Sequence, residues 1–157
     1  SAGASFAKRD GSVWTTDKDG IIMCLLAAEI KAVTGLSPLS YYEKVCKRLG
    51  RSTYTKRCDT AVSKEEKIRI AALDKSDIGV VKLGNATITD IETRSAYENL
   101  SIGGIKISTA DGWIAARPSG TEDLYKLYSE SYRSDEEAES LLQEGKVLID
   151  EALRDKK

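Results

Sequence analysis

The sequence predicts a chain of mixed α/β class in two parts: a helical part over residues 1–50 and a small α+β domain over residues 51–157. Three observations predict this class. Residues 21–33 are apolar almost all round, which is typical of a buried helix. Segments rich in β-branched residues, one with a D-G turn, gather after residue 84. Sequences of the form Ser-x-x-Glu, which favour helix starts, occur in the second part.

Residues 17–50 are expected to form a helical hairpin. Its first helix ends at Gly35, a residue suited to the left-handed conformation that follows many helices. Its second helix begins at Ser37 and Pro38, which suit the N-cap and the first turn, and it ends at Gly50. Little else in this part could cover the first helix, so we expect it to need a partner surface.

Residues 51–157 are expected to hold a mainly antiparallel sheet of four strands with two helices on one face. The two helices are predicted to begin after Ser63 and Ser134. The four strands are expected at residues 85–94, 105–109, 113–116 and 124–132.

Composition excludes several classes of protein. The chain has 157 residues with 24 Lys and Arg against 25 Asp and Glu, so a strongly basic nucleic-acid binder is not indicated. No apolar run reaches the ~18 residues of a membrane span, and we expect no membrane partner. Histidine is absent, which rules out Ser-His-Asp and Cys-His sites within these residues. Three widely spaced cysteines, with Cys24 expected to be buried, indicate a reducing, cytoplasmic compartment.

The most informative segment is the predicted loop at residues 117–122, which suits a phosphate group. Arg117 offers a planar guanidinium, while Ser119 and Thr121 offer hydroxyl donors. Gly120 would let backbone amides converge on an anion, and Lys126 on the next strand could face the same anion. The alternative is a polar turn with a surface arginine, and composition alone favours that alternative.

Two other segments have weaker functional interpretations. Lys18 lies at a helix start, where it could contact a sugar or take part in proton transfer, but a solvated lysine beside a capping Asp17 explains the residues more simply. Tyr125 and Tyr128 could stack on nucleic-acid bases, but alternation places them on opposite faces of a strand. We therefore expect them to pack and expect no nucleic-acid partner.

The combination of two motifs resembles a known family. The stretches SAGASFAKRDGSVWTTDKDGI and IGGIKISTADGWIAARPSGTEDLYKLYSES look like the C-terminal portion of the α-D-phosphohexomutases, in particular of bacterial members that act on glucose phosphates. The resemblance covers essentially the whole chain. It implies that residues 1–50 are the helical end of an incomplete α/β layered domain, the third and sugar-binding one of four. Residues 51–157 would then be the fourth domain, which binds phosphate.

The resemblance also implies a reaction. Glucose 1-phosphate and glucose 6-phosphate would interconvert through glucose 1,6-bisphosphate, with a phosphoserine in the first domain and Mg²⁺ held in the second. Neither the serine loop nor the metal loop occurs in these 157 residues. We therefore expect a fragment that is inactive alone, whose partners are hexose phosphates and the remaining domains.

Seven residues receive roles from the resemblance. Lys18 would be a candidate for general acid–base catalysis, and Ser1 would line the sugar site. The phosphate group that does not react would be held by Arg117, Ser119, Gly120, Thr121 and Lys126. Where relatives carry Arg, Lys126 loses a bidentate contact, so we expect a weaker hold there. Two alternatives stay open: a stand-alone phosphosugar-binding module, and a mutase for another hexose such as mannose or N-acetylglucosamine.

Overall fold

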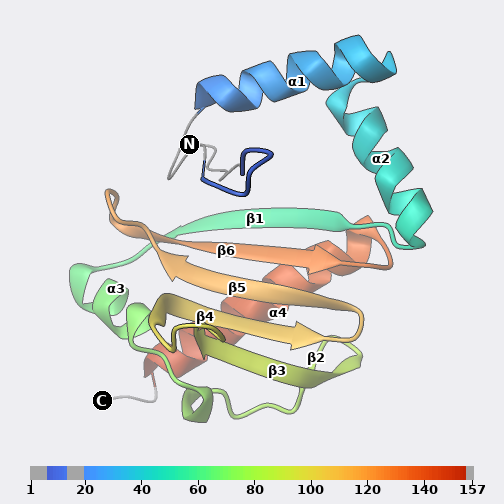
Figure 1. Cartoon of the computed structure of the whole chain (residues 1–157). Helices are drawn as coiled ribbons and strands as arrows, with labels where there is room; N and C mark the ends of the chain where they lie inside the picture. The colour runs from blue at the N-terminus through green and yellow to red at the C-terminus, as the bar shows by residue number, and fades with distance from the viewer. Residues whose placement is uncertain (1–6, 14–19, 155–157) are drawn as a thin grey trace. The chain divides into compact units, whose positions relative to one another are not determined.

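The computed structural model describes residues 7–13 and 20–154, and its chain divides into two compact units, Ser1–Arg51 and Ser52–Lys157 (Figure 1). Each unit is described by itself. The mixed α/β class predicted from the sequence agrees with the helices and the sheet that the two units contain.

The first unit contains helices α1 (Gly20–Thr34) and α2 (Pro38–Leu49), at the positions that the sequence predicts. Gly35 follows α1 with a φ of 72°, in the left-handed region that favours glycine. Ser37 caps α2, because its side chain accepts a hydrogen bond from the amide of Ser40. Gly50 ends α2 with a φ of 68°.

Two expectations for this unit are wrong. The two helices meet at a bend of 71°, which is too open for an antiparallel hairpin. None of the residues of α1 is buried, and Cys24 is exposed rather than buried. Ile21 and Val33 are 76% and 77% exposed, so nothing in the described part of this unit covers the apolar helix. No single described helix is long and apolar enough to span a membrane. Together, α1 and α2 have the length and composition of a span, but the pair is bent at its junction.

The second unit is built on a six-stranded antiparallel sheet, not on the four strands expected (Figure 1). Its strand order is β1-β6-β5-β4-β3-β2. The strands are β1 (Tyr54–Ala61), β2 (Lys82–Leu83), β3 (Ala86–Arg94), β4 (Ser101–Thr109), β5 (Gly112–Pro118) and β6 (Leu124–Ser131). The two strands that the sequence did not predict lie at the edges. β1 carries charged residues on its exposed side, and β2 is only two residues long, so neither has a strong apolar pattern.

Two α-helices, α3 (Lys64–Ala71) and α4 (Asp135–Arg154), and a short 3₁₀-helix (Lys75–Asp77) complete the second unit. The predicted capping box of α3 is present: the Ser63 side chain accepts from the Glu66 amide, and the Glu66 carboxylate accepts from the Ser63 amide.

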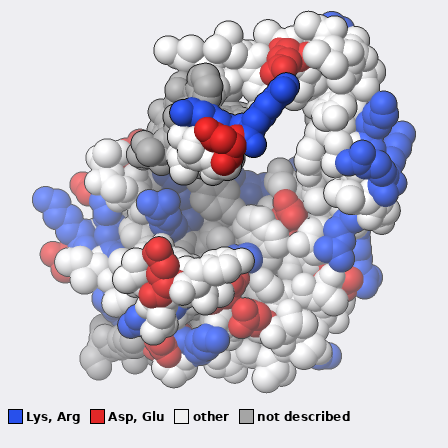
Figure 2. Space-filling view, viewed as in Figure 1, with Lys and Arg blue, Asp and Glu red and all other residues white. Residues whose placement is uncertain are grey.

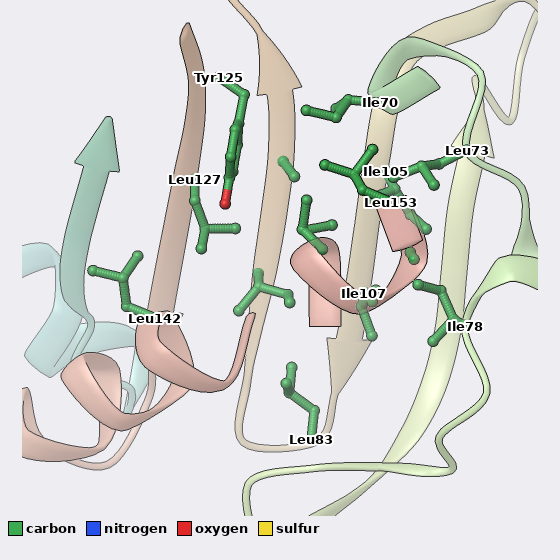
Figure 3. Close-up of a cluster of buried hydrophobic side chains, with 14 of the residues drawn as sticks. Ile70, Leu73, Ile78, Leu83, Ile105, Ile107, Tyr125, Leu127, Leu142 and Leu153 are labelled. Atoms are coloured by element: carbon green, nitrogen blue, oxygen red, sulfur yellow. The ribbon is translucent and has the colours of Figure 1, made fainter. Parts of the chain in front are cut away.

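The core of this unit lies between one face of the sheet and the two helices (Figure 3). Its fully buried side chains include Ile70 of α3, Ile107 of β4 and Leu127 of β6. Each such side chain contributes about 1.5–3 kcal/mol relative to an exposed one. The helices therefore cover one face of the sheet and leave its other face, with its alternating polar side chains, to solvent.

Glycine at position 104 allows the close approach of β4 and β5 where the candidate loop begins. A Cβ atom at Gly104 would lie 2.2 Å from the carbonyl oxygen of Ala116 and 3.2 Å from the Cα of Arg117. No side chain fits there without displacing β5. The packing of Gly104 therefore fixes the end of the strand that carries Arg117.

Candidate functional site

The loop between β5 and β6 is closed by its own hydrogen bonds. The Ser119 amide donates to the Leu124 carbonyl over 2.9 Å, and the Glu122 amide donates to Ser119 Oγ over 3.3 Å. Ser119 is only 7% exposed. Ser119, the first residue of the loop, thus organises the loop backbone through these two bonds.

Gly120 lies at an open position of the loop. The φ angle of Gly120 is not positive, so the turn does not need glycine for its backbone conformation. A Cβ atom there would meet nothing within 4 Å. Gly120 therefore leaves open space in front of the loop backbone, through which an anion can approach the amides.

Arg117 and Lys126 are cross-strand partners in the register of β5 and β6, so their side chains lie on the same face of the sheet. Arg117 is exposed, and none of the ion pairs among the described residues involves its guanidinium. Lys126, by contrast, is paired: its Nζ lies 3.2 Å from Asp59 Oδ2 and 3.5 Å from Glu122 Oε2. The two cations of the site thus differ in how readily an incoming anion could use them.

Asp59 on β1 is the carboxylate that pairs with both Arg57 and Lys126. The Arg57 guanidinium donates two hydrogen bonds to its carboxylate, over 2.7 and 2.6 Å. These bonds, followed by that from Lys126, lower the pKa of Asp59 to about 2. Arg57 also lies over the ring of Tyr128, 5.8 Å from its centroid. The carboxylate stays ionised at neutral pH and competes for Lys126.

An open groove of about 460 Å³ lies beside the loop. Arg117, Ser119 and Gly120 line one side of it, and residues of α3 and of the start of β4 line the other. Basic and acidic side chains lie next to one another over α3 and this loop, at the left of Figure 2. The structure thus brings Arg117, Ser119 and Gly120 together at one opening.

The other predicted residues are placed differently. Thr121 is exposed on the loop, and neither Thr121 nor Lys126 lines the groove. Lys18 and Ser1 lie outside the described residues. Among the described residues, no group of three or more Cys, Asp or Glu could hold a metal ion.

Two residues near the loop were missed by the sequence analysis. Asp59 lies opposite Lys126 in the register of β1 and β6, and Lys67 on α3 reaches the loop backbone. Arg57 and Asp59 are two positions apart, which places them on one face of a strand, so this spacing could have indicated Asp59 had β1 been predicted. No signal in the sequence indicates Lys67, because its contact depends on how α3 packs.

Comparison with known proteins bears directly on this loop. The model of the phosphoglucomutase/phosphomannomutase C-terminal domain matches residues 62–145, more than half of the chain and the whole of the β5–β6 loop. The chain belongs to this phosphoglucomutase/phosphomannomutase family. It is similar over 134 residues, at 48% identity, to a phosphoglucomutase of Komagataeibacter xylinus. That match covers 85% of this chain but 24% of the relative, so the chain spans about a quarter of that relative's length.

More distant members of the phosphoglucomutase/phosphomannomutase family carry names that differ in their sugar. A phosphoglucomutase/phosphomannomutase of Thermococcus kodakarensis is 35% identical over 69 residues, which are 44% of this chain and 15% of the relative. A probable phosphoglucosamine mutase of Thermococcus gammatolerans is 41% identical over 59 residues, which are 37% of this chain and 13% of the relative. The matches therefore establish the family, but the names of the relatives do not agree on one sugar substrate.

Proposed function

We propose that this chain is the C-terminal portion of a phosphoglucomutase that interconverts glucose 1-phosphate and glucose 6-phosphate through glucose 1,6-bisphosphate. Its β5–β6 loop binds the phosphate group that does not react. The observation that carries the proposal is the grouping of Arg117, Ser119 and Gly120 at one open groove. Glucose is the proposed sugar because the relative that matches 85% of this chain is named a phosphoglucomutase.

The chemistry of the loop suits a phosphate monoester. The guanidinium of Arg117 offers two parallel donors to phosphate oxygens and has no competing carboxylate among the described residues. The open backbone at Gly120 would supply neutral amide donors, and Thr121, exposed on the loop outside the lining of the groove, would add a hydroxyl. Lys126 adds positive charge from the neighbouring strand, although Asp59 and Glu122 offset part of it.

Binding at this loop would serve catalysis by positioning. The interaction energy of the remote phosphate holds the sugar in line with a phosphoserine in another domain. The two substrates carry their phosphate on different carbons, so the sugar must bind in two orientations. A loop that contacts only phosphate accepts both orientations, because it does not depend on which carbon carries the ester.

The remaining roles belong to the same proposal. Lys18 would act in proton transfer near the sugar, and Ser1 would line the sugar site. Mg²⁺ would support phosphoryl transfer from another domain, and the described residues here supply no cluster of ligands for it. Hexose phosphates and the other domains of the parent protein would be the partners. The three cysteines are all free, which supports a reducing compartment such as the cytoplasm.

A titration of the isotopically labelled chain tests the binding role. We expect glucose 6-phosphate to shift the amide resonances of residues 119–121, while glucose, which lacks the phosphate, leaves them unchanged. Equal shifts with both sugars, or none with either, would contradict the assignment of the loop.

An assay of the parent protein tests the sugar. We expect higher kcat/KM for glucose 1-phosphate than for mannose 1-phosphate or N-acetylglucosamine 1-phosphate, and stimulation by glucose 1,6-bisphosphate. Preference for another hexose would favour the alternative mutase. Turnover by the 157-residue chain alone would contradict the division of labour proposed above.

A further inference from the structure

Lys67 on α3 makes a contact across the groove to the loop. Its Nζ donates to the carbonyl oxygen of Glu122 over 2.6 Å and lies 3.7 Å from Asp123 Oδ1. Its side chain is 19% exposed, and it lines the same groove as Arg117 and Ser119. A lysine in such a position could either contact a ligand directly or hold the loop backbone in place.

The geometry favours an action on the loop. The Lys67 ammonium is already occupied by a carbonyl and a carboxylate, whereas the Arg117 guanidinium has no ion-pair partner among the described residues. A charge-assisted bond to a backbone carbonyl is stronger than a neutral one and fixes the position of the peptide group. The Lys67 side chain therefore anchors the backbone between the phosphate-contacting part of the loop and β6.

Helix α3 is a rigid base for this anchor. Its start is fixed by the Ser63–Glu66 capping box, and its Ile70 is fully buried against the core. The amide of Val62, just before the helix, also donates to the Asp123 carbonyl over 3.2 Å. Two bonds from the region of α3 thus hold residues 122 and 123, while Ser119 holds the other half of the loop.

We propose that Lys67 is a positioning residue for the phosphate-binding loop. It keeps the backbone of residues 119–122 in the conformation that receives a phosphate monoester, without contacting the phosphate itself. This inference rests on the proposed function of the loop.

The test compares variants of the whole 157-residue chain in binding glucose 6-phosphate. Lys67→Met keeps the length of the stem and removes the ammonium, so we expect roughly tenfold weaker binding, the scale of one charge-assisted hydrogen bond. Lys67→Arg can still donate to the same carbonyl, and we expect it to bind within about threefold of the unaltered chain. Lys64→Met removes the same charge from an exposed site on the same helix and should change the Kd less than about twofold.

A second readout follows the ligand-free chain. We expect Lys67→Met to speed amide hydrogen exchange at residues 120–123 and to leave the exchange of β5 and β6 unchanged. This readout does not depend on phosphate binding, so it separates the inference from the proposed function. If the unaltered chain did not bind glucose 6-phosphate, the proposed function would fail. The exchange data would still test whether Lys67 holds the loop backbone.

Three results would overturn the proposal: unchanged exchange in Lys67→Met, equal binding losses in Lys67→Met and Lys64→Met, or a Lys67→Met chain that no longer folds. The last would show that Lys67 supports the whole domain and not the loop.

Discussion

The ammonium group of Lys126 lies 3.2 Å from the carboxylate of Asp59 on the adjacent edge strand. The same lysine is the cross-strand partner of Arg117, so a cation proposed to bind phosphate is shared with an internal anion. Under the proposed function, a phosphate ester would compete with Asp59 for Lys126. The affinity of the proposed site would then depend on β1 as well as on the loop.

Replacing Lys126 by Arg should tighten binding of glucose 6-phosphate by a few-fold, because a guanidinium can serve the phosphate and Asp59 with separate N–H groups. Lys126→Met should weaken binding by a similar factor. Calorimetric titration of both variants checks the expectation. Equal affinity in all three chains would remove Lys126 from the site.

Among the residues of the loop, Arg117 should have the largest effect on catalytic efficiency when it is replaced. In the parent enzyme, Arg117→Ala is expected to lower kcat/KM by two or more orders of magnitude, on the scale of ~3 kcal/mol for a lost charge-assisted contact. Arg133→Ala is the matched control, because Arg133 is an exposed arginine paired with Asp111 at the opposite end of the sheet. Steady-state kinetics decides: a change below about threefold for Arg117→Ala would place the phosphate elsewhere.

The titration of Asp59 provides a test of the charge arrangement. Its pKa is lowered to about 2 in the folded chain from the ordinary 3.8, so folding favours the ionised form. The stabilisation is present above about pH 4 and is lost as the pH falls towards 2. Nuclear magnetic resonance of the carboxyl carbon should show the midpoint near 2.

Variants separate the two causes of that low pKa. Arg57→Met should raise the pKa of Asp59 more than Lys126→Met does, because the Arg57 hydrogen bonds are the larger cause. Lys106→Met, which removes a lysine paired with Glu92, should leave it unchanged. A larger effect of Lys126→Met would mean that the lysine is the main partner of Asp59.

The contact between β4 and β5 predicts a large effect on stability from a small substitution. Gly104→Ala places a methyl group against the Ala116 carbonyl and should lower the free energy of unfolding by roughly 2–3 kcal/mol. Gly79→Ala meets nothing within 4 Å, so a change within about 0.5 kcal/mol is expected. Urea unfolding measures both, and similar values for the two variants would contradict the close approach of the strands.

Local signals in the sequence predicted much of the framework. Ser63 and Ser37 marked helix starts correctly, and the D-G turn before Trp113 gave the β4–β5 hairpin, because caps and turns depend on neighbouring residues. β1 was missed because an edge strand with outward charges lacks an apolar pattern. The apolar character of α1 predicted burial that the described residues of its unit do not provide.

The candidate site was predictable to a similar degree. The family resemblance, and not the loop composition, assigned the phosphate role to Arg117 and Ser119, and both residues line one groove. Asp59, which pairs with Lys126, and Lys67, which donates to the Glu122 carbonyl, each lie more than 50 positions along the chain from those partners. Such contacts depend on strand register and helix packing, which a single sequence specifies only through the whole fold.

The loop is carried by β5 and β6, neither of which lies at an edge of the sheet. The two strand ends that frame it cannot separate unless the middle of the sheet opens. The loop backbone can still open locally, but the site exists only while the sheet is folded, so phosphate binding would be linked to the stability of the whole sheet. A sugar phosphate that occupies the loop should then raise the melting temperature of the whole second unit in proportion to the logarithm of its concentration, which makes a heating curve a ligand screen.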